Sequence, residues 1–145
     1  MNSLGRHLLA EFYDCASAAL NDPARIEALM NEAARRSGAT VVQSVFHAFS
    51  PHGVSGVVVV EESHLAVHTW PEYRYAAMDY FACGAVDCDA AVRCLAAHLA
   101  PARVETKEVP RGVIEGREAP LDAPFATNGE GEASLFFRNG EARER

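Results

Sequence analysis

The sequence predicts an α/β sandwich of the α+β kind, in which one antiparallel β-sheet carries two helices on one face. Strand and helix patterns follow one another in the order β-α-β-β-β-β-α-β, and very short links join the four central strands. Short links favour antiparallel neighbours, and two helices suffice to cover one face only. We therefore expect the other face to pack against the sheet of a second copy, in a homodimer.

The first strand is predicted over residues 8–13, and a helix follows it. Asp22 is the expected N-cap of this helix, Pro23 stands at its first position, and Gly38 is well placed to end it. The apolar stripe has the spacing of an amphipathic helix and consists of Ile26, Leu29, Met30 and Ala33.

The central region contains strand patterns without a helix between them. These strands are predicted over residues 40–49, 54–60, 65–70 and 75–82. A turn over residues 51–53 and a link over residues 61–64 separate the first three.

A second helix, with Asp87 or Asp89 as its cap, is predicted to end at Pro101. Its apolar side chains are Val92, Leu95, Ala96 and Leu99. A last strand over residues 104–109 completes a domain that we expect to span residues 1–114. Residues 115–145 are rich in charge, glycine and proline, which predicts a disordered tail. Its apolar cluster, residues 135–137, could instead dock on the domain or on a partner.

The composition narrows the functional classes. A chain of 145 residues with 49% hydrophobic and 23% charged residues is typical of one globular domain. Apolar runs fall far short of the roughly 20 residues of a membrane helix, so no membrane contact is expected. The net charge of −7 argues against nucleic acid as the partner. The four cysteines form no CxxC pair and no export signal is recognised, which favours a reducing, cytoplasmic location.

The densest group of reactive side chains lies in residues 61–72. His64 and His68 are four residues apart on a predicted strand, about 13 Å, so they cannot share one zinc ion and we expect no metal site. Ser63 lacks the Gly-x-Ser-x-Gly elbow of a serine hydrolase, and five residues separate it from His68. The two side chains would then face opposite ways, and Ser63 would need a base from another strand or subunit.

Longer motifs in the chain closely resemble the bacterial S-adenosylmethionine decarboxylase proenzymes. They are LGRHLLAEFYDC at 4–15, GVSGV at 53–57, ESHL at 62–65, HTWPEY at 68–73 and FACG at 81–84. The resemblance covers roughly residues 3–113. It implies the short prokaryotic type of pyruvoyl-dependent enzyme, which decarboxylates S-adenosylmethionine and thereby supplies aminopropyl groups for spermidine.

The resemblance implies that such an enzyme makes its own cofactor. The bond between Glu62 and Ser63 is cut by autocatalytic serinolysis, which gives chains 1–62 and 63–145. Ser63 becomes the pyruvoyl group that forms a Schiff base with the substrate, without metal or pyridoxal phosphate. A hairpin at residues 61–64 can hold the hydroxyl against its own preceding carbonyl, as this chemistry requires.

Further roles follow from the same resemblance. His68 matches the base of the processing reaction, and Ser55 matches a residue that stabilises its intermediate; spacing alone would make Ser55 a small turn residue. Cys83 matches the proton donor of catalysis, and a thiol can transfer its proton readily at neutral pH. Without the resemblance, Cys83 is typical of a small buried residue at a strand end.

The resemblance also implies a substrate site that two protomers share. Phe49 and Trp70 match the side chains that stack on the adenine, and Glu72 matches the carboxylate that binds the ribose. One protomer would provide Ser63 and Cys83, and the other would provide Phe49, Ser55, His68 and Glu72.

The chain departs from the family pattern at two positions near these residues. Arg74 stands where glycine is common, which would place a cation next to Glu72, and Ala82 replaces a threonine beside Cys83. Two alternatives therefore remain open. One is a pyruvoyl-dependent decarboxylase of ornithine or arginine, and the other is an unprocessed regulatory homologue that binds a partner.

Overall fold

The structure is a computed structural model that describes residues 2–115, 127–128, 136–138 and 141–143. Its strands are β1 (Asn2–Tyr13), β2 (Val41–Ala48), β3 (Val54–Val60), β4 (Ser63–Trp70), β5 (Tyr75–Ala82), β6 (Arg103–Val113), β7 (Thr127–Asn128), β8 (Phe136–Arg138) and β9 (Glu141–Arg143). The helices are α1 (Pro23–Arg36) and α2 (Cys88–Leu99), with short 3-10 turns η1 (Ala18–Asn21) and η2 (Pro71–Tyr73). No helix of the described part is long and apolar enough to cross a membrane.

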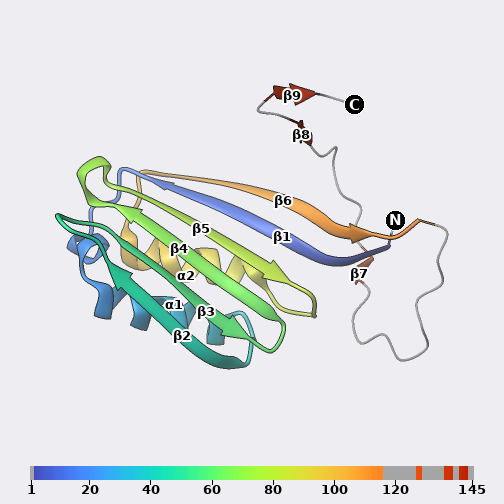
Figure 1. Ribbon diagram of the computed structural model, residues 1–145. Coiled ribbons are helices and arrows are strands. Elements are labelled where there is room, and N and C mark those ends of the chain that lie inside the picture. The colour runs from blue at the N-terminus through green and yellow to red at the C-terminus, as the bar shows by residue number, and fades with distance from the viewer. Residues whose placement is uncertain (1, 116–126, 129–135, 139–140, 144–145) are drawn as a thin grey trace.

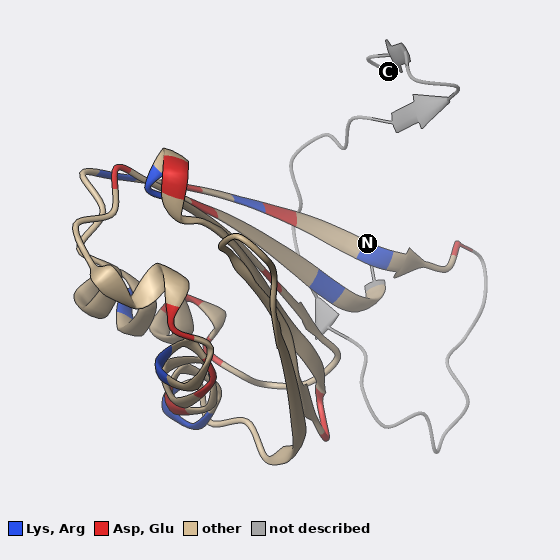
Figure 2. Ribbon diagram, turned by 60° about the vertical axis from the view of Figure 1, so that its left-hand side comes forward, with Lys and Arg blue, Asp and Glu red and all other residues tan. Residues whose placement is uncertain are grey.

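The main sheet is antiparallel and has the strand order β2-β3-β4-β5-β1-β6, with β7 paired to the beginning of β1. Both helices lie on the same side of this sheet (Figures 1 and 2). The predicted fold class is therefore confirmed, and so is the order of the elements through β6. We call the side that the helices leave uncovered the open face.

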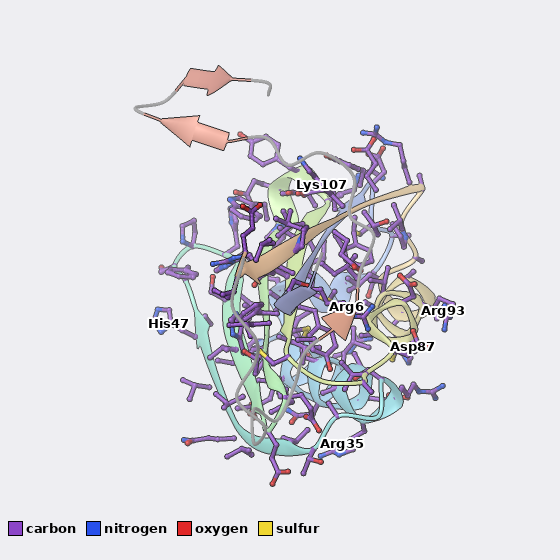
Figure 3. All side chains as sticks on the ribbon, turned by 90° about the vertical axis from the view of Figure 1, so that its right-hand side faces the viewer. Arg6, Arg35, His47, Asp87, Arg93 and Lys107 are labelled. Carbon is purple, nitrogen blue, oxygen red and sulfur yellow. The ribbon has the colours of Figure 1, made fainter. Side chains whose placement is uncertain are left out.

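Side chains alternate between the two faces along each strand. Leu65, Val67 and Thr69 of β4 are buried beneath the helices, whereas His68 and Trp70 lie on the open face and are exposed. The core under the helices is closed by large side chains with almost no exposure, which include Phe12, Ile26, Met30, Tyr80, Leu95 and Leu99. On the open face His47 points away from the helix side, where Arg35 and Arg93 lie (Figure 3).

The predicted ends of α1 agree with the structure. The Asp22 carboxylate accepts a hydrogen bond from the Arg25 backbone N–H at 3.1 Å, and Pro23 opens the helix. Gly38 follows the helix with φ of 86°, a conformation that glycine adopts without steric cost. Of the two candidate caps for α2, Asp87 is the N-cap: its side chain accepts from the Ala90 N–H at 2.9 Å.

Several strand bounds differ from the prediction. β1 begins at Asn2 rather than near residue 8, because its pairing with β6 continues to Ser3 opposite Val113. β6 runs past Pro110, since an edge strand tolerates a residue without an N–H. β4 begins at Ser63, which leaves a tight turn in place of the expected four-residue link.

Most of residues 115–145, including Leu135 of the predicted apolar cluster, lies outside the described residues. Within the described part, β7 pairs with β1, and β8 pairs with β9. The expected disorder of this segment and its docking role stay predictions.

Candidate active site

The first group of predicted site residues lies on the open face where β3 begins and β4 ends. Ser55 and His68 are direct partners in the antiparallel register of these strands. The Ser55 hydroxyl and His68 Nδ1 lie 2.7 Å apart and share a hydrogen bond. A serine thus holds the imidazole in one orientation, as a base for proton transfer requires.

A cavity of about 300 Å³ opens beside this pair. Its lining consists of Phe49, His52, Gly53, Ser55, His68, Thr69, Trp70 and Glu72. Phe49 and Trp70 remain 51% and 39% exposed, so aromatic surface is available to a planar ligand. The predicted substrate-binding residues Phe49, Trp70 and Glu72 are therefore brought together with Ser55 and His68.

Local hydrogen bonds hold this group in place. The Thr69 hydroxyl donates to the Leu20 carbonyl at 2.7 Å and accepts from the Val54 N–H at 2.8 Å, which fixes the end of β4 against β3. η2 then turns the chain and places Glu72 in the cavity wall. The prediction included neither Thr69 nor His52. The pattern of β4 could have indicated Thr69 as a buried polar group.

His52 forms an ion pair with Glu72, with 3.0 Å between His52 Nε2 and the carboxylate. It belongs to the turn between β2 and β3, which the sequence indicates only as a turn. This contact places the His52 ring beside the predicted ribose-binding carboxylate, and both side chains remain 38% exposed.

The second group lies at the opposite end of β4. Ser63 is the first residue of the strand, and its φ of 138° is a strained backbone conformation for a residue with a side chain. The Cys83 N–H donates to the Glu62 carbonyl at 2.8 Å. The peptide bond between Glu62 and Ser63 is therefore polarised at its oxygen and strained on its nitrogen side.

The Cys83 thiol lies close to β1. A Cβ atom on Gly5 would come within 3.3 Å of Cys83 Sγ and within 2.9 Å of the Phe81 ring. Glycine at this position lets β1 and β5 approach each other next to the thiol. Cys83 is half-buried, in contrast to the other three cysteines, which are buried.

The two groups do not meet within one chain. Ser63 and His68 are five residues apart on β4, which corresponds to about 16 Å along a strand. Glu62, Ser63 and Cys83 form one cluster, and the cavity with Ser55 and His68 forms the other.

Comparison with known proteins identifies the family of the chain. The family model for S-adenosylmethionine decarboxylase matches residues 6–112. The chain belongs to the S-adenosylmethionine decarboxylase family. It is 52% identical over 125 residues to the S-adenosylmethionine decarboxylase proenzyme of Thermotoga maritima, covering 86% of this chain and 96% of that protein. The proenzyme of Moorella thermoacetica is 51% identical over 120 residues, covering 82% of this chain and 96% of that protein.

A solved structure of the family has a similar fold. The crystal structure of the adenosylmethionine decarboxylase from Aquifex aeolicus VF5 aligns with a TM-score of 0.71 and 30% sequence identity. The alignment covers 81% of this chain and 98% of that one. The predicted family is thereby confirmed.

The two departures from the family pattern lie away from the cavity. The Arg74 guanidinium binds Asp14 at 2.9 Å and does not line the cavity beside Glu72. Its φ of 50° is left-handed, a conformation that glycine would adopt without steric cost. The Ala82 side chain is fully buried under the helices, so a threonine there would not face the Cys83 thiol on the open side.

The remaining three cysteines are buried in the fold. Burial raises the pKa of Cys15 and Cys94, and it raises the pKa of Cys88 to about 11. A high thiol pKa keeps these groups protonated and unreactive near neutral pH. Of the four cysteines, Cys83 alone is partly accessible.

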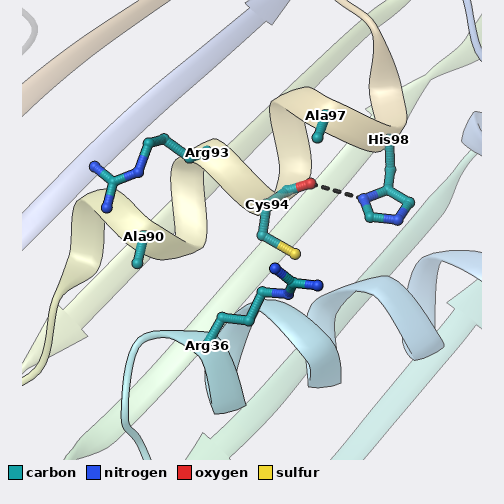
Figure 4. Close-up of a pocket in the computed structure, with 6 residues that line it drawn as sticks. All are labelled: Arg36, Ala90, Arg93, Cys94, Ala97 and His98. Atoms are coloured by element: carbon teal, nitrogen blue, oxygen red, sulfur yellow. Dashed lines mark hydrogen bonds between the residues drawn. The ribbon is translucent and has the colours of Figure 1, made fainter.

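A second cavity, of about 430 Å³, lies between α1 and α2 on the helix side (Figure 4). Arg36, Arg93 and His98 line it together with Ala90, Cys94 and Ala97. Both arginines already have carboxylate partners: Glu32 at 2.8 Å and Asp87 at 3.2 Å. His98 donates through Nδ1 to the Cys94 carbonyl at 2.9 Å. Because its arginines are paired and it shares no lining residue with the cavity beside Ser55 and His68, this cavity is not part of the candidate active site.

Proposed function

We propose that this chain decarboxylates S-adenosylmethionine, releasing carbon dioxide and the decarboxylated product that donates aminopropyl groups in spermidine synthesis. Membership of the family carries this proposal, and the cavity with Phe49, Trp70 and Glu72 supports it. Two aromatic faces suit an adenine ring and a sulfonium cation, and a carboxylate suits ribose hydroxyls.

The proposal includes self-cleavage between Glu62 and Ser63. The Ser63 hydroxyl attacks the Glu62 carbonyl carbon, the bond to the Ser63 nitrogen breaks, and that nitrogen takes up a proton. Loss of the Cα proton from the ester then expels the Glu62 carboxylate. Water hydrolyses the resulting dehydroalanine to a pyruvoyl group and ammonia. The strained Ser63 and the Cys83 N–H on the Glu62 oxygen support the first step, because that oxygen becomes negative in it.

His68 is the proposed base for removal of the Cα proton, and Ser55 orients it. Because Ser63 and His68 lie about 16 Å apart along one strand, the base would come from a second chain. His68 of the partner subunit would act on Ser63 of this one. The open face supports such a pairing, since the helices leave it uncovered and it carries exposed apolar side chains such as Val45, Val59 and Trp70.

The pyruvoyl group supplies an electron sink for decarboxylation, as pyridoxal phosphate does in other enzymes. The residues present fit such a group: Ser63 would be its source, and the half-buried Cys83 follows Ala82, the partner of Ser63 in the sheet register. Cys83 is the proposed proton donor to the product Cα. Neither a metal nor pyridoxal phosphate is required. Free thiols persist in a reducing compartment, which suits a cytoplasmic enzyme.

Decarboxylation of ornithine or arginine is the less supported alternative, because Arg74 binds Asp14 and leaves the cavity unchanged. An unprocessed binding homologue is the other alternative. Intact-mass measurement of the purified chain, with assays on S-adenosylmethionine, ornithine and arginine, separates the three. We expect two chains and turnover of S-adenosylmethionine. A single uncut species of 15.7 kDa would contradict self-cleavage. The variant Ser63→Ala should remain uncut and inactive.

A further inference from the structure

A cluster of titratable side chains lies on the open face next to the proposed cleavage site. Asp79 of β5 is its centre: the Asp79 carboxylate is 2.9 Å from His7 Nε2 and 3.4 Å from His64 Nε2. The two histidines belong to β1 and β4, the strands on either side of β5. The ligand-type atoms of these three residues lie within 4.8 Å of one another. We call this group the His7–Asp79–His64 cluster.

Arg111 of β6 fixes which nitrogen of the His7 ring donates and which accepts. Its Nη1 lies 2.8 Å from His7 Nδ1, and a guanidinium can only donate. His7 Nδ1 therefore accepts, and its proton resides on Nε2, which donates to Asp79. A cation bound at His7 Nε2 would have to displace this proton beside a guanidinium. The contacts therefore favour a hydrogen-bonded network over a metal site.

The Phe81 ring is the packing surface on which the cluster rests. In the sheet register Phe81 lies opposite His7 on one side and opposite His64 on the other. Its ring centroid is 5.4 Å from that of His7 and 6.0 Å from that of His64, and the Arg111 guanidinium lies 5.3 Å above it. Side chains from three other strands are thus packed around one ring, and the Asp79 carboxylate contacts the two histidines among them.

His64 connects this network to the reaction, because it directly follows Ser63. Before cleavage, the chain holds position 63 from both sides. After cleavage, position 63 is a chain end, and chain ends fray unless contacts hold them. Among the described residues, Asp79 is the only acidic partner of the His64 side chain.

We propose that Asp79 and His7 are positioning residues: they tether His64 and so hold the group formed from Ser63 against Cys83 once the chain is cut. The inference rests on the proposed self-cleavage. It assigns the cluster a role after the cut rather than during it.

The variant Asp79→Asn tests this role. Intact mass should show complete cleavage, because the uncut turn holds Ser63 without the tether. A displacement of about 1 Å at a reacting centre can cost roughly a hundredfold in rate. We therefore expect kcat for S-adenosylmethionine to fall about tenfold or more, with KM within about twofold of the wild-type value. The matched control Glu32→Gln removes an exposed carboxylate–arginine pair on the helix side and should leave both constants unchanged.

Hydrogen exchange distinguishes the tether from a general structural role. Asp79→Asn should speed amide exchange at residues 64–66 in the cut enzyme but not in the uncut Ser63→Ala background. His7→Ala should lower kcat in the same way, and His7→Gln, which restores a donor to Asp79, should recover part of it. Normal kcat in fully cut Asp79→Asn enzyme, blocked cleavage in that variant, or equal exchange effects in both backgrounds would overturn the proposal. A wild-type chain that stays uncut would instead contradict the proposed function itself.

Discussion

Ser63 and His68 occupy opposite ends of the same strand, β4, about 16 Å apart along it. His68 is hydrogen-bonded to Ser55 in the cavity wall, whereas Ser63 lies next to the half-buried Cys83. In the proposed mechanism, one chain therefore carries two halves of a site, and each half works with the complementary half of another chain.

This separation predicts complementation between two inactive variants. Ser63→Ala and His68→Ala should each be uncut and inactive alone. In a mixed dimer, one of the two sites combines the intact Ser63 with the intact His68. Co-expression with random pairing should then restore roughly a quarter of the wild-type activity, since half of the dimers would be mixed and each would contain one working site.

Mass measurement adds a sharper criterion to this test, because only the chain with His68→Ala retains Ser63 and should be cut. Absence of both activity and cleavage in verified mixed dimers would show that the two halves do not combine across chains. Mixing Ser63→Ala with Cys83→Ala is a negative control for restored activity. Both residues belong to the same half, so no site in the mixed dimer contains both of them intact.

The ion pair between His52 and Glu72 predicts a substrate-binding effect. His52→Ala should raise KM for S-adenosylmethionine several-fold with little change in kcat, since a partly exposed pair contributes about 1 kcal/mol or less to the orientation of the carboxylate. Steady-state kinetics of the processed enzyme would measure this. A fall in kcat at constant KM would place His52 in the chemical step instead.

Replacement of Arg74 by glycine should not change the substrate. The left-handed backbone costs a non-glycine residue about 1 kcal/mol, and the exposed pair with Asp14 returns about the same. Arg74→Gly should therefore unfold in urea at nearly the wild-type free energy and should keep the preference for S-adenosylmethionine over ornithine and arginine. A shift in preference away from S-adenosylmethionine would instead show that Arg74 influences the substrate pocket.

The environments of the four thiols predict selective alkylation. Burial raises the pKa of Cys15, Cys88 and Cys94, so few thiolates form there at pH 8, and the protein also blocks access to them. N-ethylmaleimide should modify native protein first at Cys83, with loss of decarboxylation. Peptide mapping would identify the site, and labelling in urea should reach all four. Preferential labelling of a helix cysteine would contradict the described burial.

Local patterns in the sequence predicted most of the fold. The cap at Asp22 and the apolar stripe of α1 were sufficient to place that helix, because both signals are local. The end of β6 was missed since Pro110 usually ends a strand, and only its place at the sheet edge permits it to continue. The roles of Ser63 and Cys83 were inferred from family motifs and stay predictions. His7 and Asp79 were not found, because a register between distant strands brings them together.

The order of the strands has a physical consequence for a chain cut after Glu62. The upstream piece would contain β1, β2 and β3, and the downstream piece β4, β5 and β6. Because β1 lies between β5 and β6, and β3 lies beside β4, the pieces interlock at three strand boundaries. The two pieces would therefore migrate as one species in a separation under native conditions. Once denatured, the two pieces would have to find each other by collision, so the uncut precursor is the form with a fast, unimolecular route to this fold.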